Sequence, residues 1–404
     1  MVDLLSADYD IVCRYQGGNN AGHTVINDYG KIVLNLLPSG ISREGTVNVM
    51  GNGMVIDLEH LVHEIQSLRD KGIHIGPDNL KISDKAVICL PWHKMQDIME
   101  EDRLKDKKFG STRRGIGPVY ADKYMKKAIR MGDLFAPDKL PEKVADLTEW
   151  KNLTVRGYGH EPVKAEDILA WLHEFGDPIK PYITDVSDYL YDAATAGENI
   201  MFEAQLGALR DIDFGIYPYT SSSCTLAGYA TIGAGIPGLK LDKTIGIMKA
   251  YSSCVGEGPF TVEMFGDEAE ALRRAGGEYG AATGRPRRVG AFDIPASRYG
   301  VRMHGADCIA LTKMDVLSYM DKIPVCVAYD INGEITEKFP VGERLNAAKP
   351  VFEYMEGFGD ISGCRKPEDL PKAAMDYIRY LEAAVGCKIK YVSVGAGRDE
   401  YVEL

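Results

Sequence analysis

Apolar, β-branched runs recur along the whole chain, and segments with helical periodicity separate them. Several runs are apolar on both faces, as buried parallel strands require. The expected strands cover residues 10–15, 31–37, 47–50, 86–90, 199–202, 244–248, 308–312, 324–329 and 388–394. Apolar stripes predict helices over 58–68 and 374–385, the second of which Gly386 closes. This alternation predicts an α/β fold: one large, mostly parallel central sheet with helices on both faces.

The organisation of the chain favours a single domain with insertions over residues 1–404, because no internal repeat and no linker-like segment interrupts it. Residues 1–5 are typical of the last turn of a helix, and no strand precedes them. In open α/β folds the first strand and the loop after it commonly hold nucleotide phosphates. We therefore expect this domain to lack its first strand and to be incomplete at its N-terminus.

Composition excludes several classes of protein. The net charge of −12 argues against a general nucleic-acid binder. The eight cysteines are scattered without CxxC pairs, which is typical of reduced thiols in a cytoplasmic protein. An uncharged window covers residues 214–239, but its prolines, glycines and hydroxyls predict a binding loop that leads into a helix. No membrane association is expected.

A glycine-rich loop, Gln-Gly-Gly-Asn-Asn-Ala-Gly-His-Thr over residues 16–24, follows the first expected strand. Its glycines free backbone amides, its asparagines add donors, and His23 can protonate or polarise an oxygen. This pattern favours a loop that holds phosphate oxygens or a metal. The alternative is a tight turn with an incidental histidine.

Three further loops carry polar groups. Residues 111–118 combine hydroxyls with cations that suit a phosphate monoester, although a solvated basic surface explains them equally well. Residues 220–223 form a hydroxyl run, indicating either an anion-binding helix N-terminus or a simple N-cap cluster. Residues 280–288 bring together three arginines whose planar groups match carboxylate or phosphate. The neighbouring Thr-Gly and Pro weigh against a solvated charge run there.

The string Thr-Lys-Met-Asp ends the expected strand 308–312. The Asp315 carboxylate can accept hydrogen bonds from N1–H and the 2-amino group of guanine, while the Lys313 stem covers the ring. Adenine offers no such pair of donors, so the arrangement selects guanine. Its place at the carboxyl end of a strand is the usual ligand side of parallel sheets.

Six motifs in order resemble the adenylosuccinate synthetase family over essentially the whole chain: RYQGGNNAGHT, RGIGPVYADK, DIDFGIYPYTSSS, VGEGPF, TGRPRR and LTKMDVL. The resemblance implies a P-loop-NTPase-related sheet and a cytoplasmic homodimer. It also implies GTP-dependent ligation of IMP and L-aspartate with Mg²⁺. A base takes the N1 proton of IMP while O6 attacks the γ-phosphate of GTP, and the aspartate amine then displaces the new phosphate.

The resemblance also implies roles for individual residues. The catalytic residues are His23, at the transferring phosphoryl group, and Gln205. The IMP-binding set is Asn20, Thr112, Lys126, Ser221 and Arg285, with Lys126 reaching the neighbouring subunit's IMP. The aspartate-binding set is Val255, Thr283, Arg285 and Arg287. The GTP-binding set is Gly22, His23, Thr24, Arg287, Lys313, Met314, Asp315, Ser393, Val394 and Gly395. The Gly22 carbonyl is the expected Mg²⁺ ligand.

Departures from the family pattern leave alternatives open. The family's WGDEGKGK loop, with the base aspartate and a phosphate-binding lysine, is expected just before Met1 and is absent, so we predict that these residues alone are inactive or nearly so. Leu206 stands where the family has a glutamine, and the adjacent Gln205 is the candidate to replace it. A non-catalytic IMP- or GTP-binding paralogue is the first alternative. Cys254 and Ala282 replace an Arg and a Thr near the amino-acid pocket, so a ligase with a different amine acceptor is the second.

Overall fold

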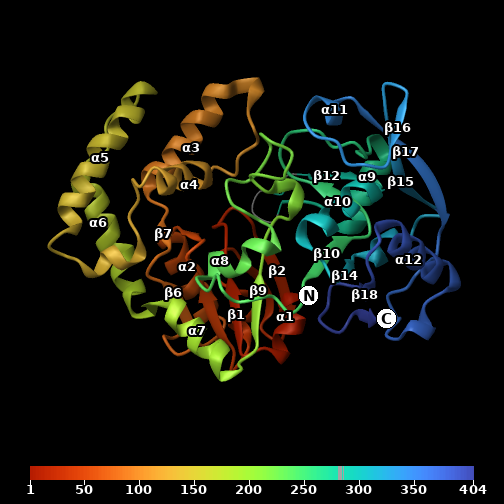
Figure 1. Cartoon of the computed structure of the whole chain (residues 1–404), viewed down its shortest axis with the longest axis horizontal. Helices are drawn as coiled ribbons and strands as arrows, with labels where there is room; N and C mark the ends of the chain where they lie inside the picture. Colours follow the sequence, from red (N-terminus) through yellow and green to blue (C-terminus); the bar gives the residue numbers. More distant parts are fainter. Residues whose placement is uncertain (281–283, 285) are drawn as a thin grey trace. The chain divides into compact units, whose positions relative to one another are not determined.

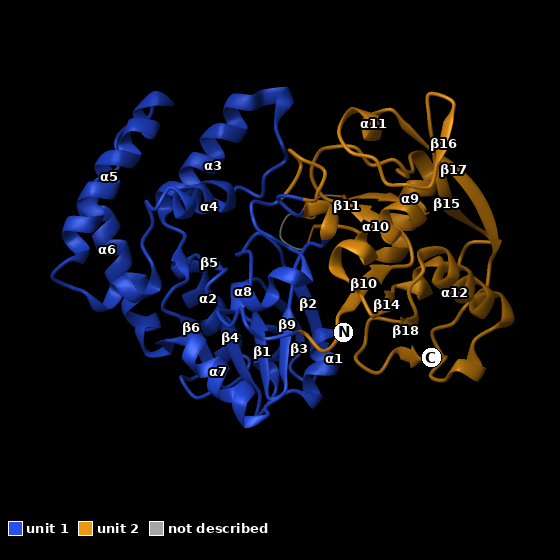
Figure 2. Ribbon diagram, in the orientation of Figure 1, with its two compact units in different colours: residues 1–207, 211–213, 221–240 blue, residues 208–210, 214–220, 241–404 orange. Residues whose placement is uncertain are grey.

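The computed structural model describes residues 1–280, 284 and 286–404 (Figure 1). The chain divides into two compact units (Figure 2). Unit 1 comprises residues 1–207, 211–213 and 221–240, and unit 2 comprises residues 208–210, 214–220 and 241–404. Each unit has its own parallel sheet and its own buried cluster of apolar side chains.

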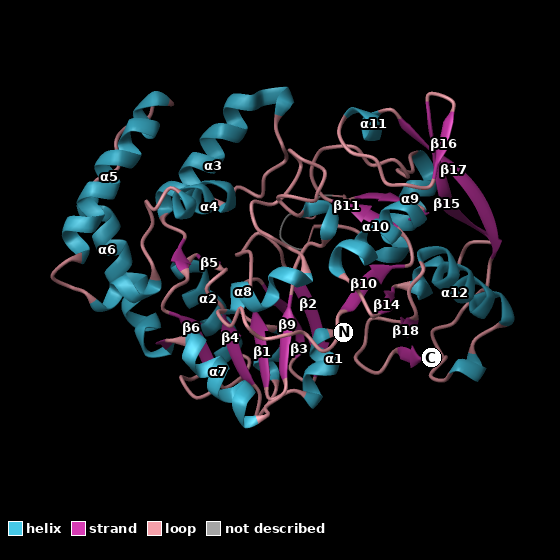
Figure 3. Ribbon diagram, in the orientation of Figure 1, coloured by secondary structure: helices cyan, strands magenta, loops and turns pink. Residues whose placement is uncertain are grey.

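The sheet of unit 1 is wholly parallel, with its strands side by side in Figure 3. Its order is β8 (Ile183–Thr184), β6 (Leu80–Ser83), β4 (Val47–Met50), β1 (Ile11–Arg14) and β9 (Ile200–Glu203). β1 therefore lies inside the sheet, and the glycine-rich loop begins at its carboxyl end.

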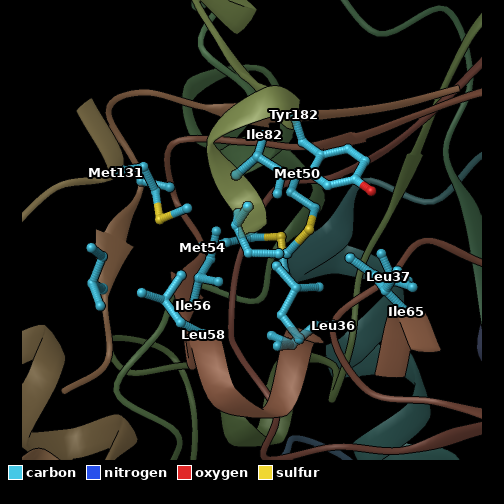
Figure 4. Close-up of a cluster of buried hydrophobic side chains, with 14 of the residues drawn as sticks. Leu36, Leu37, Met50, Met54, Ile56, Leu58, Ile65, Ile82, Met131 and Tyr182 are labelled. Carbon is cyan, nitrogen blue, oxygen red and sulfur yellow. The ribbon is translucent and has the colours of Figure 1, made fainter. Parts of the chain in front are cut away.

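Helices cover both faces of this sheet, as predicted. One face packs Met50 and Ile82 against α2 (Leu58–Arg69) and α6 (Ala165–Gly176), and Figure 4 shows part of that cluster. The other face packs Ile11 and Val49 against α7 (Val186–Ala196) and α8 (Ala230–Ala234). Successive residues of a strand point to opposite faces, so Val49 and Met50 enter different clusters.

The remaining elements of unit 1 surround this core. The helices are α1 (Val2–Leu5), α3 (Pro91–Leu104), α4 (Ile116–Tyr124) and α5 (Leu140–Gly157). The strands are β2 (His23–Asn27) and β3 (Gly30–Leu34), which form an antiparallel hairpin, and β5 (Val55–Ile56) and β7 (Val87–Ile88), which pair in parallel.

Unit 2 contains a second sheet, in which β10 (Ile245–Lys249), β14 (Cys308–Thr312) and β18 (Ile389–Ser393) are parallel and β19 (Tyr401–Glu403) is antiparallel to β18. A further sheet joins β13 (Phe292–Asp293), β15 (Lys322–Ile331), β16 (Glu334–Thr336) and β17 (Ala348–Glu356). The pair β11 (Ser252–Cys254) and β12 (Arg288–Gly290) is antiparallel. The helices are α9 (Gly266–Gly276), α10 (Ile294–His304), α11 (Glu343–Asn346) and α12 (Lys372–Val385).

The α/β class with parallel central strands is confirmed, but two details differ from expectation. Apart from the short parallel pairs β5–β7 and β13–β15, the parallel strands form two separate ladders, one in each unit, with β9 and β10 as end strands, where a single sheet was predicted. The run 31–37 is not a buried parallel strand, because β3 pairs in a hairpin and exposes Lys31 and Val33. The window 214–239 is mainly loop that leads into α8, as predicted. Among the described residues, no helix is long and apolar enough to cross a membrane.

A buried carboxyl in unit 2 gives a prediction about stability. Asp293 caps α10 by accepting a hydrogen bond from the Ala296 N–H, and the Tyr329 hydroxyl lies 2.7 Å from each carboxyl oxygen. Burial raises the pKa of Asp293 to about 6. A raised carboxyl pKa means that the folded state binds more protons than the unfolded state, so this contribution stabilises at low pH and is lost as pH rises through about 6.

We therefore expect wild-type stability to fall by about 1.4 kcal/mol between pH 5 and 7.5 relative to Asp293→Asn. Urea unfolding of both proteins across this range measures the difference. Asp185→Asn is the matched control, because Asp185 caps α7 with a carboxylate whose pKa is lowered, chiefly by Lys85. A difference between wild type and Asp293→Asn that does not change with pH would contradict the assignment.

Candidate functional site

The glycine-rich loop after β1 is packed too closely for side chains at its first two glycines. A Cβ on Gly17, where φ is +77°, would lie 1.8 Å from Gln205 Nε2, and one on Gly18 would lie 2.7 Å from the Val55 carbonyl oxygen. The Gly17 N–H donates to the Tyr120 hydroxyl at 2.9 Å. The glycines therefore allow the backbone to approach β5 and α4, and the loop keeps a defined shape.

Asn20 and Gln205 meet although 185 residues separate them. The Gln205 Nε2 donates to Asn20 Oδ1 at 3.0 Å, and Gln205 Oε1 accepts from Arg14 Nη2 at 2.6 Å. Leu206 has a φ of +81° and is 46% exposed, so the position where the family has glutamine offers no polar group. The structure thus brings together the residues predicted for IMP binding and catalysis, and it places the amide of residue 205, not 206, in their network.

His23 begins β2 and lies beside a carboxylate that sequence reasoning missed. Its Nε2 is 3.4 Å from Glu203 Oε1, yet it is buried without a hydrogen-bond partner among the described residues. Burial lowers the pKa of His23, and Glu203 opposes that change. A neutral imidazole with an unpartnered nitrogen suits donation to, or acceptance from, a ligand oxygen.

Two charged residues missed in the sequence hold this region together. Glu203 accepts from the Ser39 N–H at 2.8 Å and the Ser39 hydroxyl at 2.7 Å. Arg14 is buried and donates to the Asn35 carbonyl as well as to Gln205. Each ends an apolar strand, β9 or β1, at its carboxyl end. A charge directly after an apolar run is the one signal by which they could have been found.

The loop 109–115 is held by two carboxylates of α3 that the sequence analysis also missed. Asp97 accepts from the Ser111 hydroxyl at 2.5 Å and from the Gly115 N–H at 2.8 Å. Glu101, one turn later, accepts from the N–H groups of residues 109 and 110 at 3.1 and 3.2 Å. Thr112 at the tip is exposed, as is Lys126 beyond the end of α4. Two carboxylates of α3 therefore fix the conformation of this loop, and Thr112, its predicted ligand residue, is exposed.

The hydroxyl run 220–223 is not a helix N-terminus, and neither of the two interpretations given for it is right. The helix α8 begins only at Ala230, and its N-cap is Tyr229 without a side-chain hydrogen bond. Instead, the Ser221 hydroxyl lies 3.2 Å from that of Ser223, which donates to Gln16 Oε1 at 3.1 Å. Ser221 is therefore tied to the start of the glycine-rich loop in unit 1.

In unit 2, the predicted guanine-binding residues gather at the carboxyl ends of two adjacent strands. Lys313 to Asp315 follow β14, and Ser393 to Gly395 end β18, which pairs with β14 in parallel. Asp315 Oδ1 is buried and has no hydrogen-bond partner among the described residues. Burial raises the pKa of Asp315. An unpaired buried carboxylate oxygen is costly, so it points to a missing donor.

Two other members of the predicted GTP set can offer a ligand only backbone groups. Met314 and Val394 are fully buried in the core of unit 2, so their side chains are not available to a ligand. The Ser393 hydroxyl donates to the Gly395 carbonyl at 2.9 Å, which shapes the loop after β18. Thr24 is exposed on β2 in unit 1.

The residues predicted for aspartate binding are described only in part. Thr283 and Arg285 lie outside the described residues. Val255 is 64% exposed, and its carbonyl accepts from Arg210 Nη2 at 2.9 Å. Arg287 is half-buried and pairs with Glu278 at 2.8 Å, while its Nε is buried without a hydrogen-bond partner in the described part of the chain. The unpartnered nitrogen leaves one donor for a ligand.

Candidate metal ligands are sparse. In the described ranges, no group of three or more His, Cys, Asp or Glu side chains could hold a metal ion. The Gly22 carbonyl remains a hard oxygen donor at the end of the glycine-rich loop. A Mg²⁺ ion here would therefore take most of its ligands from phosphate and water, as is usual for nucleotide-bound Mg²⁺.

Comparisons with known proteins give one result. The family model described as "Adenylosuccinate synthetase" matches residues 1–402. The adenylosuccinate synthetase of Caldanaerobacter subterraneus subsp. tengcongensis is 44% identical, covering 100% of this chain and 95% of the relative. That of Streptococcus gordonii is 42% identical over 99% of this chain and 93% of the relative. A solved structure, "fully ligated Adenylosuccinate synthetase from Plasmodium falciparum", has a TM-score of 0.92 and 35% identity, covering 100% of this chain and 95% of that one.

Proposed function

We propose, because this chain belongs to the adenylosuccinate synthetase family, that it joins IMP to L-aspartate through a 6-phosphoryl-IMP intermediate. Members of this family are GTP-dependent carbon–nitrogen ligases of purine biosynthesis. The observation that carries the proposal is the unpaired Asp315 Oδ1 at the carboxyl end of β14, since N1–H and the 2-amino group of guanine are the donors it lacks.

In the first proposed step, IMP O6 forms a bond to the γ-phosphorus of GTP while the bond to the bridging oxygen breaks and GDP leaves. A base takes the IMP N1 proton. His23 is the residue we assign to the transferring phosphoryl group, because its Nε2 is unpartnered and the nearby Glu203 carboxylate favours an imidazolium once a proton is gained. Phosphoryl transfer depends mainly on positioning and charge neutralisation, which is what such groups supply.

In the second step, the aspartate amine bonds to C6 and orthophosphate leaves with O6, after which the amine nitrogen loses a proton. We assign the purine to Asn20 and Gln205, whose amides share one network, and we assign Thr112 and Ser221 to other parts of IMP. We assign Lys126 to the phosphate of the neighbouring subunit's IMP. We assign aspartate to Thr283, Arg285 and Arg287, with Val255 lining the pocket and Arg285 also near the IMP ribose. The free Nε of Arg287 supports its part in this assignment.

A bound Mg²⁺ would neutralise charge on the nucleotide phosphates. We propose the Gly22 carbonyl as its protein ligand, together with oxygens of the substrate. The GTP set also keeps Gly22, His23 and Thr24 for the phosphates, and Lys313, Ser393 and Gly395 for the base.

We further propose that residues 1–404 act as a single synthetase domain, since the family model runs over residues 1–402. A cytoplasmic location and a homodimer are proposed from the family resemblance alone.

One assay tests the reaction and both alternatives. The purified chain is incubated with GTP, IMP, Mg²⁺ and either aspartate or another amino acid, and adenylosuccinate and orthophosphate are quantified by chromatography. We expect both products to form in equal amounts and only with aspartate. Product formation with another amino acid would favour a different amine acceptor, whereas calorimetric binding of IMP and GDP without any product would favour a non-catalytic paralogue.

A further inference from the structure

The structure contains a charge cluster in unit 2 around Glu278, a residue to which the reaction outlined above gives no role. Glu278 is completely buried, and three cations surround its carboxylate. Lys249 Nζ lies 2.8 Å and Lys313 Nζ 3.1 Å from Oε1, while Arg287 Nη1 lies 2.8 Å from Oε2. The Tyr251 hydroxyl donates to Oε1 at 2.5 Å. We call Glu278 and these four residues the Glu278 cluster.

The Glu278 cluster lies next to the predicted guanine-binding residues, at the carboxyl ends of β10 and β14. Lys249 ends β10, and Lys313 directly follows β14, which pairs with β10 in parallel so that Lys249 lies opposite Thr312. Asp315, with its unpartnered oxygen, is two residues beyond Lys313. The side chain of Lys313 is expected to cover the purine. Its Nζ donates a hydrogen bond to Glu278 Oε1 and another, at 2.6 Å, to the Gly276 carbonyl.

Glu278 itself is fixed by its backbone. It follows α9, where its N–H donates to the Arg273 carbonyl at 2.9 Å, and its carbonyl accepts from the Arg287 N–H at 2.9 Å. Because both backbone groups of Glu278 are hydrogen-bonded, its carboxylate stays at one place in the fold. The positions of the three cations are therefore set by the position of Glu278.

The balance of charge makes the carboxylate necessary. Three cations that are 29 to 36% exposed share a single anion, so two positive charges remain uncompensated. Without Glu278, the three would repel each other at short range and the flexible lysines would turn toward water. Lys313 would then leave the place that a guanine ring needs covered.

We propose that Glu278 is a positioning residue for guanine-nucleotide binding, which it supports by holding Lys313 and Arg287 in place. The role rests on the proposed function, because it takes Lys313 and Asp315 as the guanine-binding residues. Glu278 does not touch the nucleotide, so its effect passes through Lys313.

Calorimetric titration of GDP and of IMP into the full chain tests the proposal. Glu278→Gln is expected to weaken GDP binding at least about tenfold, because it leaves three partly buried cations without their shared anion, and to change IMP binding less than about twofold. In a Lys313→Met background, Glu278→Gln is expected to have little further effect, since the residue it positions is gone. Glu270→Gln is the matched control, because Glu270 pairs with Arg273 and Arg274 on the exposed side of α9.

A second variant covers the case in which Glu278→Gln does not fold. Tyr251→Phe removes only the hydrogen bond to Glu278 and is expected to weaken GDP binding about two- to fivefold, again only when Lys313 is present. Unchanged GDP binding by the variant that folds, or an equal loss with and without Lys313, would overturn the role of Glu278. Failure of the unaltered chain to bind GDP would overturn the proposed function and this role together.

Discussion

Asp315→Asn is expected to weaken GDP binding at least about a hundredfold and to improve binding of xanthosine diphosphate. The carboxylate can only accept hydrogen bonds, and its buried Oδ1 lacks a donor among the described residues. An asparagine amide in the same place presents an N–H₂ group to the 2-amino group of guanine, so two donors face each other. Xanthine carries a carbonyl at that position and restores the pairing. Sites built around buried hydrogen bonds discriminate strongly against mismatched analogues.

Calorimetry with GDP, XDP and ADP measures this preference without requiring turnover. Asp360→Asn is the control, because Asp360 is an exposed carboxylate that accepts from the Ser362 N–H. Equal GDP affinities of the wild-type and Asp315→Asn proteins would show that Asp315 does not bind guanine, and the proposed function would lose its main support. A loss for GDP, XDP and ADP alike would instead indicate a collapsed loop after β14.

His23→Ala is expected to lower the rate constant of product formation about 10²- to 10³-fold, with IMP and GDP affinities changed less than about threefold. The reason is that the unpartnered Nε2 is assigned to charge on the transferring phosphoryl group, which is greatest in the transition state. Quenched samples taken from single-turnover reactions over seconds to days give the rate constant even when turnover is slow.

His63→Ala is the matched control, since His63 is exposed on α2. A second comparison uses Glu203→Gln, which keeps the size of the side chain but removes the charge 3.4 Å from His23 Nε2. It is expected to lower the rate less than His23→Ala, because the part assigned to Glu203 in the chemical step passes through the imidazole. An unchanged rate for His23→Ala would show that the imidazole takes no part in the chemical step.

Several features of the molecule could be predicted from sequence because they depend on residues close together in the chain. The period of apolar residues predicted the α/β class, and it gave Val47–Met50 and Cys308–Thr312 with their exact bounds. Gly386 ends α12 as expected, because glycine readily adopts the left-handed conformation of a helix C-cap. The glycine-rich loop after β1 and the Lys313–Asp315 string were likewise found from local pattern alone.

Tertiary structure decided which of these groups contact each other and how their pKa values change. Nothing near Asn20 in the sequence indicates that Gln205 bonds to it, or that Glu203 stands beside His23, since strand order determines both contacts. The hydroxyls of residues 220–223 fit an N-cap by composition, yet their bond to Gln16 excludes one. Glu278 is an ordinary glutamate in the sequence. Burial alone would raise its pKa, but the charges and hydrogen bonds that folding brings to it, those of Lys249 above all, outweigh burial and lower the pKa to about 2.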